Sequence, residues 1–321
     1  MARIFAIAVL LLLGLVPVLA AVFHQPFYVT LFTRILIFGL AALGLNLILG
    51  FGAMVSFGHA MYMGIGAYAV GMLSHHGVGN GWAHIGAALV VGAVIALAVG
   101  AICLRTSGMA FIMITLAFAQ MLFFLAISLK EYGGDDGLPV SARSDFGVFS
   151  LADGNVLYYF AYALLLAALV GSWRLMHARF GIVLRGCKSN ERRMRALGFP
   201  TLRYKLVAYV ISALVCVLAG VLLANLTRFV APAYMAWTVS GELIVITVLG
   251  GLGTLIGPVV GATALLLLEE GLSSLKLGVP SIDTLINQHW LGLIGLFIVG
   301  VVLVLKQGIY GWLVSREKGR A

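Results

Sequence analysis

A small set of polar side chains stands inside long apolar runs of this sequence. The set comprises Asn46, Ser56, His59, Thr115 and Gln120. Their amide, hydroxyl and imidazole groups are candidates to line a pathway through which a polar solute crosses a membrane. The alternative is packing, because Ser and Thr often bond to their own helix backbone, and Asn, Gln and His often bridge adjacent helices.

Motifs of the common catalytic and phosphate-binding sites are missing from the sequence. It has no GxxxxGK[ST] loop, so the chain does not bind ATP in that way, and it has no HExxH, CxxC or GxSxG. The adjacent residues His75 and His76 would point in different directions on a helix, so we interpret them as interfacial polar residues rather than metal ligands. We therefore predict no catalytic residue, no metal site and no cofactor in this chain.

Acidic residues within the apolar runs are scarce. Glu242 opens one such run, and Glu269 and Glu270 approach the end of another, without an obvious Lys or Arg partner inside the membrane. Carriers coupled to protons or ions usually have ionisable groups in mid-membrane, so this scarcity favours a pathway powered from outside the chain. Glu242 also has a structural interpretation, as an acid near a helix N-terminus with Ser240 as the cap.

The composition predicts that the polar residues named above are held in place by membrane helices. The chain is 62% hydrophobic and 10% charged, with a mean hydropathy of +1.11, whereas charged residues make up roughly a quarter of soluble domains. Its 40 glycines would let transmembrane helices approach closely. The net charge of +9 needs no nucleic acid, because anionic membrane lipid is the default counter-surface.

About ten apolar runs have the length of a membrane span. They cover residues 4–23, 31–49, 53–74, 83–104, 108–128, 156–173, 206–226, 240–256, 258–275 and 288–306. The sequence thus predicts an all-α polytopic protein with a single transmembrane domain over residues 1–321. Residues 50–52 are too few for an ordinary loop, so the second and third runs are predicted to form a broken or re-entrant element. The first run is predicted to be an uncleaved span, although Val18-Leu19-Ala20 resembles a signal-peptide cleavage site.

Charged loops predict the orientation of these spans. Residues 174–205 hold nine Lys and Arg and one acid, Glu191, whereas residues 130–155 hold five acids and two bases. Positive loops stay on the cytoplasmic side. We therefore predict cytoplasmic N- and C-termini, an outer loop at 129–155 and a cytoplasmic loop at 174–205.

Several tracts, taken in order, resemble the LivM-type permeases of bacterial ATP-driven importers of branched-chain amino acids, over about residues 35–306. The tracts are GLNLILG at 44–50, SFGHA at 56–60, ITLAFAQ at 114–120, GG and GL at 133–138, NE and ALG at 190–198, RYK at 203–205, and GGLGTLIGPVVGA at 250–262. Glycine and proline interruptions in both halves are typical of helices broken around a transport pathway. The chain departs from many such permeases at Ala53-Met54, where they have Gly-Gln, and at Arg193 and Met194, where they have small residues.

The resemblance implies a division of labour in the bacterial inner membrane. A homologous second permease would complete the pathway, two ATPase subunits would bind ATP and Mg, and a periplasmic binding protein would deliver branched-chain or related hydrophobic amino acids. Permeases of this kind also serve urea, amides and other small organic compounds, so those substrates stay open. A stand-alone secondary transporter is a further alternative, which would work without partner subunits.

The resemblance also implies that the 174–205 loop carries the helix that couples the ATPases to the spans. We assign this role to Arg185, Asn190, Glu191, Arg192, Ala196, Leu197 and Gly198. Asn190 can cap a short helix that Gly198 ends. A longer helix from Phe180 would align Leu184, Cys187, Glu191 and Met194 in one stripe, with Glu191 inserted into a groove of a partner. The alternative is a basic amphipathic helix lying on anionic lipid.

Overall fold

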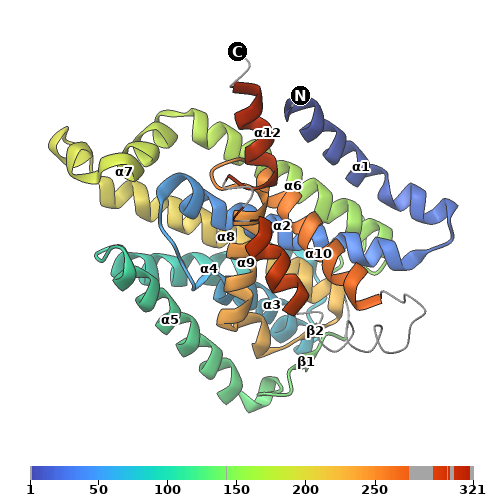
Figure 1. Cartoon of the computed structure of the whole chain (residues 1–321). Helices are drawn as coiled ribbons and strands as arrows, with labels where there is room; N and C mark the ends of the chain where they lie inside the picture. The colour runs from blue at the N-terminus through green and yellow to red at the C-terminus, as the bar shows by residue number, and fades with distance from the viewer. Residues whose placement is uncertain (1, 142, 275–291, 302, 304–306, 319–321) are drawn as a thin grey trace.

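Apolar runs of the sequence form long helices that pack into one bundle (Figure 1). The structure, a computed structural model of the 321-residue chain, describes residues 2–141, 143–274, 292–301, 303 and 307–318. The named helices are α1 (Ala2–Val22), α2 (Pro26–Gly52), α3 (His59–His75), α4 (Gly81–Cys103), α5 (Met109–Ser128), α6 (Gly154–His177), α7 (Arg179–Ala196), α8 (Thr201–Thr227), α9 (Trp237–Gly250), α10 (Gly257–Ser274) and α12 (Ile309–Lys318). Two short 3-10 turns, η1 (Lys130–Tyr132) and η2 (Pro232–Met235), and two short strands, β1 (Leu138–Pro139) and β2 (Phe229–Val230), complete the named elements.

Six helices of the described residues are long and apolar enough to cross a membrane. They lie at Ile4–Val22, Pro26–Gly52, Gly81–Cys103, Met109–Ser128, Gly154–His177 and Thr201–Thr227. Shorter helices occupy three of the other predicted runs, namely α3, α9 and α10, and the run at 288–306 lies partly outside the described residues. The all-α membrane fold is thus confirmed, and the number of about ten spans stays a prediction.

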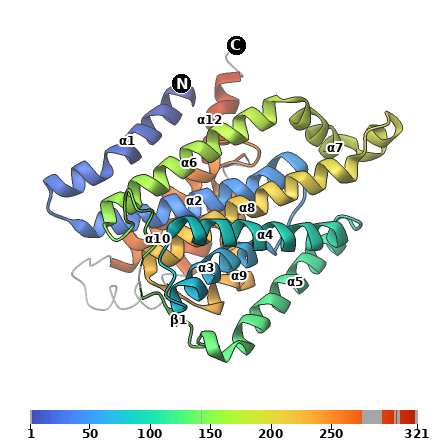
Figure 2. The ribbon, with the colours of Figure 1, turned by 180° about the vertical axis from the view of Figure 1, so that it is seen from behind.

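The centre of the bundle is α2, whose most apolar stretch is entirely buried. It packs against α8, α6, α9 and α10, and α8 in turn packs against α3 (Figures 1 and 2). At the crossing of α3 and α8 the two backbones touch reciprocally. A Cβ on Gly66 would collide with the carbonyl of Val217, and a Cβ on Gly220 would collide with the carbonyl of Met63. The glycines therefore have the packing role that the composition predicted.

The break between α2 and α3 lies later than the sequence predicted. Helix α2 continues through residues 50–52 and ends at Ala53, which adopts the left-handed conformation with φ 54°. The N–H groups of Ala53 and Met54 both return to the carbonyl of Ile48, that of Met54 at 3.0 Å. Residues 54–58 are not helical, and α3 begins at His59. The sequence predicted the break at residues 50–52, because the pattern of apolar residues does not show which residue adopts the left-handed conformation that ends the helix.

A second non-helical segment precedes α9, within the connection that the sequence predicted between the runs at 206–226 and 240–256. Strand β2 pairs antiparallel with β1, and the chain then packs η2 against α3 and α5 before α9 starts at Trp237. A Cβ on Gly64 of α3 would meet the Met235 side chain, so η2 lies beside the middle of α3. Non-helical backbone at this depth is tolerated where protein surrounds it. The predicted span at 240–256 is therefore a 14-residue helix, α9, followed by a turn at 251–256.

Loops gather at two opposite ends of the bundle. One end, here called the basic end, holds α7, the 104–108 link, the 251–256 turn, the start of α1 and α12; the rings of Phe5 and Tyr310 stack with centroids 6.3 Å apart. The other, called the acidic end, holds residues 76–80, the 129–153 segment and β2, with the His76 ring 3.2 Å from the Tyr132 hydroxyl. Residues 129–153 and α7 thus lie at opposite ends of the bundle. That the basic end faces the cytoplasm stays a prediction.

Candidate functional site

His59, at the first position of α3, is the centre of a buried polar network. Its Nδ1 lies 2.9 Å from the Ser56 hydroxyl and its Nε2 lies 2.9 Å from the hydroxyl of Ser212 on α8. The Ser212 hydroxyl donates to the Gly44 carbonyl of α2 at 2.6 Å, and the Gly58 N–H donates to the Ser56 hydroxyl. The network therefore joins α2, α3 and α8 beside the break between α2 and α3.

Hydrogen-bond directions in this network determine the tautomer of His59. The Ser212 hydroxyl donates its single proton to the Gly44 carbonyl, so it can only accept a hydrogen bond from His59. The Nε2 atom of His59 therefore carries the proton. The neutral Nδ1 then accepts from Ser56. The hydrogen bonds thus run in series from the Gly58 N–H through Ser56, His59 and Ser212 to the Gly44 carbonyl, and each of these groups finds its partner within the protein.

Two tyrosines that the sequence did not single out surround His59. The imidazole lies 5.7 Å from the ring of Tyr62 and 5.5 Å from the ring of Tyr209, both in edge-on geometry. The Tyr62 hydroxyl donates to that of Tyr209 at 3.1 Å. The structure also adds Ser212 to the polar set. A lone serine in an apolar helix was the available signal, and it is weak because such serines usually bond to their own backbone.

Thr115 joins this region through α5, whereas Asn46 does not. Thr115 is buried and donates to the Ile112 carbonyl at 2.9 Å, and a Cβ on Gly58 would lie 2.8 Å from the Thr115 carbonyl. Asn46 instead binds the 251–256 turn, donating to the Thr254 carbonyl at 2.7 Å and accepting from the Gly253 N–H at 3.1 Å. Gln120 is half-buried one and a half turns beyond Thr115 on α5.

Ser240 and Glu242 do not form the helix start that the sequence predicted. Helix α9 begins at Trp237, so both residues lie inside it. The Ser240 hydroxyl accepts a hydrogen bond from the N–H of Ala60 in the first turn of α3. Ser240 therefore caps another helix rather than its own, and the capping interpretation of Glu242 is wrong. Its Oε1 is buried and has no hydrogen-bond partner within the part of the chain that the structure describes.

Helix α7 at the basic end confirms the predicted cap and contradicts the predicted stripe. Asn190 accepts from the N–H of Arg193 at 3.0 Å, but its own backbone is extended, with φ −158° and ψ 99°, and breaks α7 in two. Leu184 and Cys187 precede the break and are buried against the bundle. Glu191 and Met194 follow the break, so they do not continue their stripe.

Glu191 binds within its own chain rather than presenting itself to a groove. Its carboxylate pairs with Arg195 at 2.6 Å and with Lys205 of α8, and it accepts from the Thr201 hydroxyl at 3.3 Å. Partial burial alone would raise the pKa of Glu191, but the hydrogen bonds and charges of Lys205 and Arg195 outweigh it and hold that pKa below its ordinary value. The acid thus ties the end of α7 to α8.

Residues 192–200, here called the tip, project from the basic end (Figures 1 and 2). The exposed residues of the tip are Arg192, Arg193, Arg195, Ala196, Leu197, Gly198, Phe199 and Pro200. Leu197 is 66% exposed and Phe199 is 38% exposed. Gly198 adopts φ 86° and the Phe199 N–H returns to the Met194 carbonyl, so Gly198 ends the helix as predicted. Arg185, predicted to take part in ATPase coupling, donates to the carbonyls of Met176 and Gly181 at the junction of α6 and α7.

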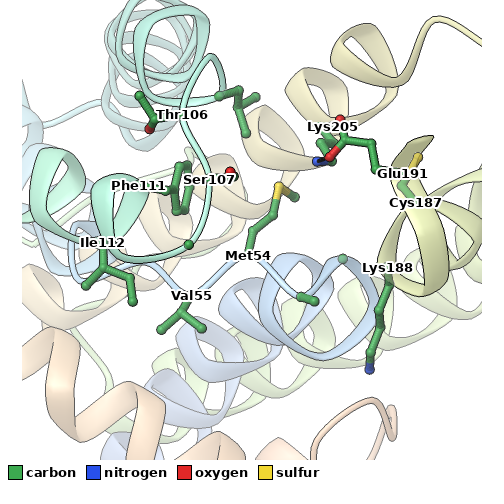
Figure 3. A pocket seen from close by; sticks show the side chains of 14 residues that line it. Met54, Val55, Thr106, Ser107, Phe111, Ile112, Cys187, Lys188, Glu191 and Lys205 are labelled. Atoms are coloured by element: carbon green, nitrogen blue, oxygen red, sulfur yellow. Dashed lines mark hydrogen bonds and ion pairs between the residues drawn. The ribbon is translucent and has the colours of Figure 1, made fainter. Parts of the chain in front are cut away.

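A cavity of about 200 Å³ lies between α7 and the break (Figure 3). It is lined by residues 52–55 of the break, by the 104–108 link and the start of α5, and by Cys187, Lys188, Glu191 and Lys205. In Figure 3 the Lys205 and Glu191 side chains meet on one side, while Lys188 points away from them. Its ammonium group donates to the Gly50 carbonyl in the last turn of α2, at 2.7 Å.

Comparison with known proteins gives the family of this chain. The model of the family described as "Branched-chain amino acid transport system / permease component" matches residues 27–305. The chain belongs to this permease family. Together with the six membrane-spanning helices of the described residues, membership makes the chain a multi-pass inner-membrane protein.

Curated relatives of this permease chain are named as branched-chain amino acid permeases. "High-affinity branched-chain amino acid transport system permease protein LivM" of Salmonella typhimurium is 28% identical over 263 residues, which are 74% of this chain and 62% of the relative. LivM of Escherichia coli is 27% identical over 80% of this chain and 68% of its own length. LivH of Escherichia coli is 26% identical over 85% of this chain and 91% of its own length. The chain spans less than two thirds of the Salmonella LivM, and no solved structure matches it.

Proposed function

We propose that the chain is a permease subunit of an ATP-driven importer, and that it translocates branched-chain or related hydrophobic amino acids. Support comes from the family match over residues 27–305 and from relatives that are named as parts of branched-chain amino acid transport systems. Relatives of two kinds, LivM and LivH, suggest a second permease as partner. Two ATPase subunits that bind ATP and Mg, and a periplasmic binding protein, would complete the complex.

The observation that carries the coupling part of this proposal is the tip. Its apolar residues Leu197 and Phe199 are exposed among Arg192, Arg193 and Arg195, beyond the apolar helices. Glu191 holds the tip to α8 through charge-assisted contacts, so the tip has a defined shape before any partner binds. An ordered apolar and basic projection suits docking to an ATPase subunit. Lipid binding by the same face is the alternative.

We place the substrate pathway beside the start of α3. Ser56, His59 and Thr115 gather there, but their polar groups are satisfied within the chain. In this conformation they would form the wall of the pathway, and contact with the solute would require the His59 network to open. Asn46 and Gln120, at the 251–256 turn and further along α5, would border the same route.

Reconstitution of the chain with its partner subunits in liposomes tests the proposal. We expect ATP-dependent uptake of leucine, isoleucine or valine that requires the binding protein and stops with a hydrolysis-deficient ATPase. Uptake of urea or an amide instead would keep the importer and change the substrate. Uptake by the chain alone under an ion gradient would show a secondary transporter and contradict the proposal.

The tip is tested by the double substitution Glu191→Ala with Leu197→Ala. It should leave membrane insertion intact, yet release the ATPase subunits during purification or uncouple hydrolysis from uptake. Arg179→Ala, at the other end of α7, serves as the control that removes an exposed base from the same helix. Normal assembly with normal coupled uptake in the double variant would rule out the tip as the coupling element.

A further inference from the structure

We propose that Lys188 is a positioning residue that links the tip to the break between α2 and α3, so that movement of the tip shifts the wall of the pathway. This inference rests on the proposed function. It adds a route inside the chain, from Lys188 through Gly50 to residues 53–58. Neither the family match nor the names of the relatives assign a role to these residues.

The chemistry of the helix end explains why Lys188 binds there. The last four carbonyls of a helix lack intrahelical partners, and the C-terminal end of the helix dipole is negative. Gly50 lies in the last turn of α2, and its carbonyl accepts from the Lys188 ammonium at 2.7 Å. A cation at this place both satisfies the carbonyl and interacts favourably with the dipole. The contact is thus a charge-assisted hydrogen bond between α7 and the end of the central helix.

Gly50 is held from its other side as well. A Cβ on Gly50 would collide with the Asn46 side chain and lie 2.5 Å from the Gly253 nitrogen, so the 251–256 turn packs directly on it. Asn46 fixes that turn through its bonds to Gly253 and Thr254. The end of α2 is therefore closely packed. A displacement of Lys188 would move this helix end as a unit, because the surrounding side chains leave no space in which the displacement could be lost.

The segment after Gly50 is the part that can respond. Ala53 occupies the left-handed region at φ 54°, which costs an alanine about 1 kcal/mol, and residues 54–58 are not helical. Ser56 in this segment begins the His59 network. The cavity of about 200 Å³ separates the same segment from Cys187 and Glu191, so there is room for it to move toward α7.

The tip and Lys188 are joined by a short piece of backbone. The two-way attachment of Glu191 to Arg195 and Lys205 makes the tip one unit with the start of α8. Lys188 lies three residues before Glu191, across the extended Asn190. A partner that moved the tip would therefore move Lys188 with it, and the Gly50 carbonyl would follow.

Uptake per ATP hydrolysed is the measurement that tests this role in the reconstituted complex. Lys188→Met removes the donor but keeps the apolar stem, Lys188→Arg keeps a donor, and Arg179→Met is the matched control on the same helix. Because substitutions along a coupling route change the coupling by about two- to thirtyfold, we expect uptake per ATP to fall by an amount in that range in Lys188→Met. Lys188→Arg should recover most of it, and Arg179→Met should match the wild type.

Two results of the uptake experiment would overturn the inference. One is an unchanged uptake per ATP in Lys188→Met. The other is a parallel fall of hydrolysis and uptake that Lys188→Arg does not rescue, because a merely structural role predicts that pattern.

A second measurement needs no transport and so separates this inference from the proposed function. Val55→Cys is placed in the break of a variant that lacks Cys103, Cys187 and Cys216, and its rate of maleimide labelling is measured in the isolated chain. Lys188→Met should raise that rate several-fold, whereas Arg179→Met should not. Equal rates would overturn the link even in a complex that transports normally. If the wild-type complex imports nothing, the proposed function fails while the labelling result still stands.

Discussion

The Ser240 hydroxyl of α9 accepts a hydrogen bond from the backbone N–H of Ala60 in the first turn of α3, at 3.0 Å. Helix α3 has Gly58 as its N-cap residue and gains no cap from a side chain of its own N-cap. Because the start of α3 is buried, its free N–H groups need partners from the protein. A residue 180 positions away in sequence therefore supplies what a local Ser or Asp would supply in an ordinary helix.

Ser240→Ala should destabilise the protein by about 1–2 kcal/mol, the usual effect of removing an N-terminal cap. Thermal unfolding in detergent measures this loss. Ser273→Ala at an exposed position of α10 is the control, since the Ser273 hydroxyl donates to the Glu270 carbonyl of its own helix at 3.1 Å. Equal midpoints for the two variants would mean that Ala60 finds another partner.

Ala53→Gly should stabilise the protein by about 1 kcal/mol, because glycine adopts the left-handed conformation of this position without steric cost. The control is Ala98→Gly, at an exposed position inside α4, which should destabilise by a similar amount. Chemical or thermal unfolding compares the two variants. A lower stability for Ala53→Gly would contradict the strain assigned to the end of α2.

His59→Ala should cost about 3 kcal/mol, since it opens a cavity and leaves polar groups of Ser56 and Ser212 unpaired. Ser212→Ala alone should cost less, and the double variant should cost less than the sum, because the residues share one network. Thermal unfolding in detergent measures the stability of each variant, and uptake by the reconstituted complex measures its transport activity. Loss of uptake with stability retained would instead indicate that His59 contacts the solute.

Acid should weaken the contact between the tip and α8. The pKa of Glu191 in the folded protein lies below its ordinary value of 4.5, so the stabilisation is fully present above that value and is lost as pH falls through the lower, folded pKa. The difference in unfolding midpoint between wild type and Glu191→Gln should be constant from pH 7 to about 5 and shrink below it. A difference that grows with acid would reverse the assigned sign.

Ser141 and Ser189 should be accessible from opposite sides of the membrane. Both are exposed, in the 129–153 segment and on α7, at opposite ends of the bundle. Single cysteines at these positions, in a variant without native cysteines, can be labelled with a membrane-impermeant maleimide in intact cells. Reaction only at position 141 supports a cytoplasmic basic end, and reaction at both positions would refute it.

Helices and ends of this fold could be predicted because their signals are local. Apolar runs and charged loops identified the spanning helices, and Asn190 and Gly198 identified the ends of the tip helix from residue type alone. The end of α2 escaped because backbone conformation decides it, since Ala53 ends α2 in the left-handed conformation although alanine favours helix.

Contacts between distant segments could not be predicted from one sequence. The apolar runs showed Ser56, His59 and Ser212 as polar residues but gave no indication that Ser212, which lies 153 positions from His59, would meet it. Glu191 was interpreted as an acid for a partner, because its bond to Lys205 depends on how α7 folds back on α8. The pathway role of Asn46, Ser56, His59, Thr115 and Gln120 stays a prediction.

The reciprocal glycine contact limits how this molecule can change shape. The carbonyls of Val217 and Met63 each occupy the place where a side chain of the facing helix would stand. A slide of α3 along α8 by even one residue, about 1.5 Å, would replace glycine with a bulkier neighbour at both points. The two helices are thus one stiff frame, and any change of shape in this chain falls to the links and broken helices that surround it.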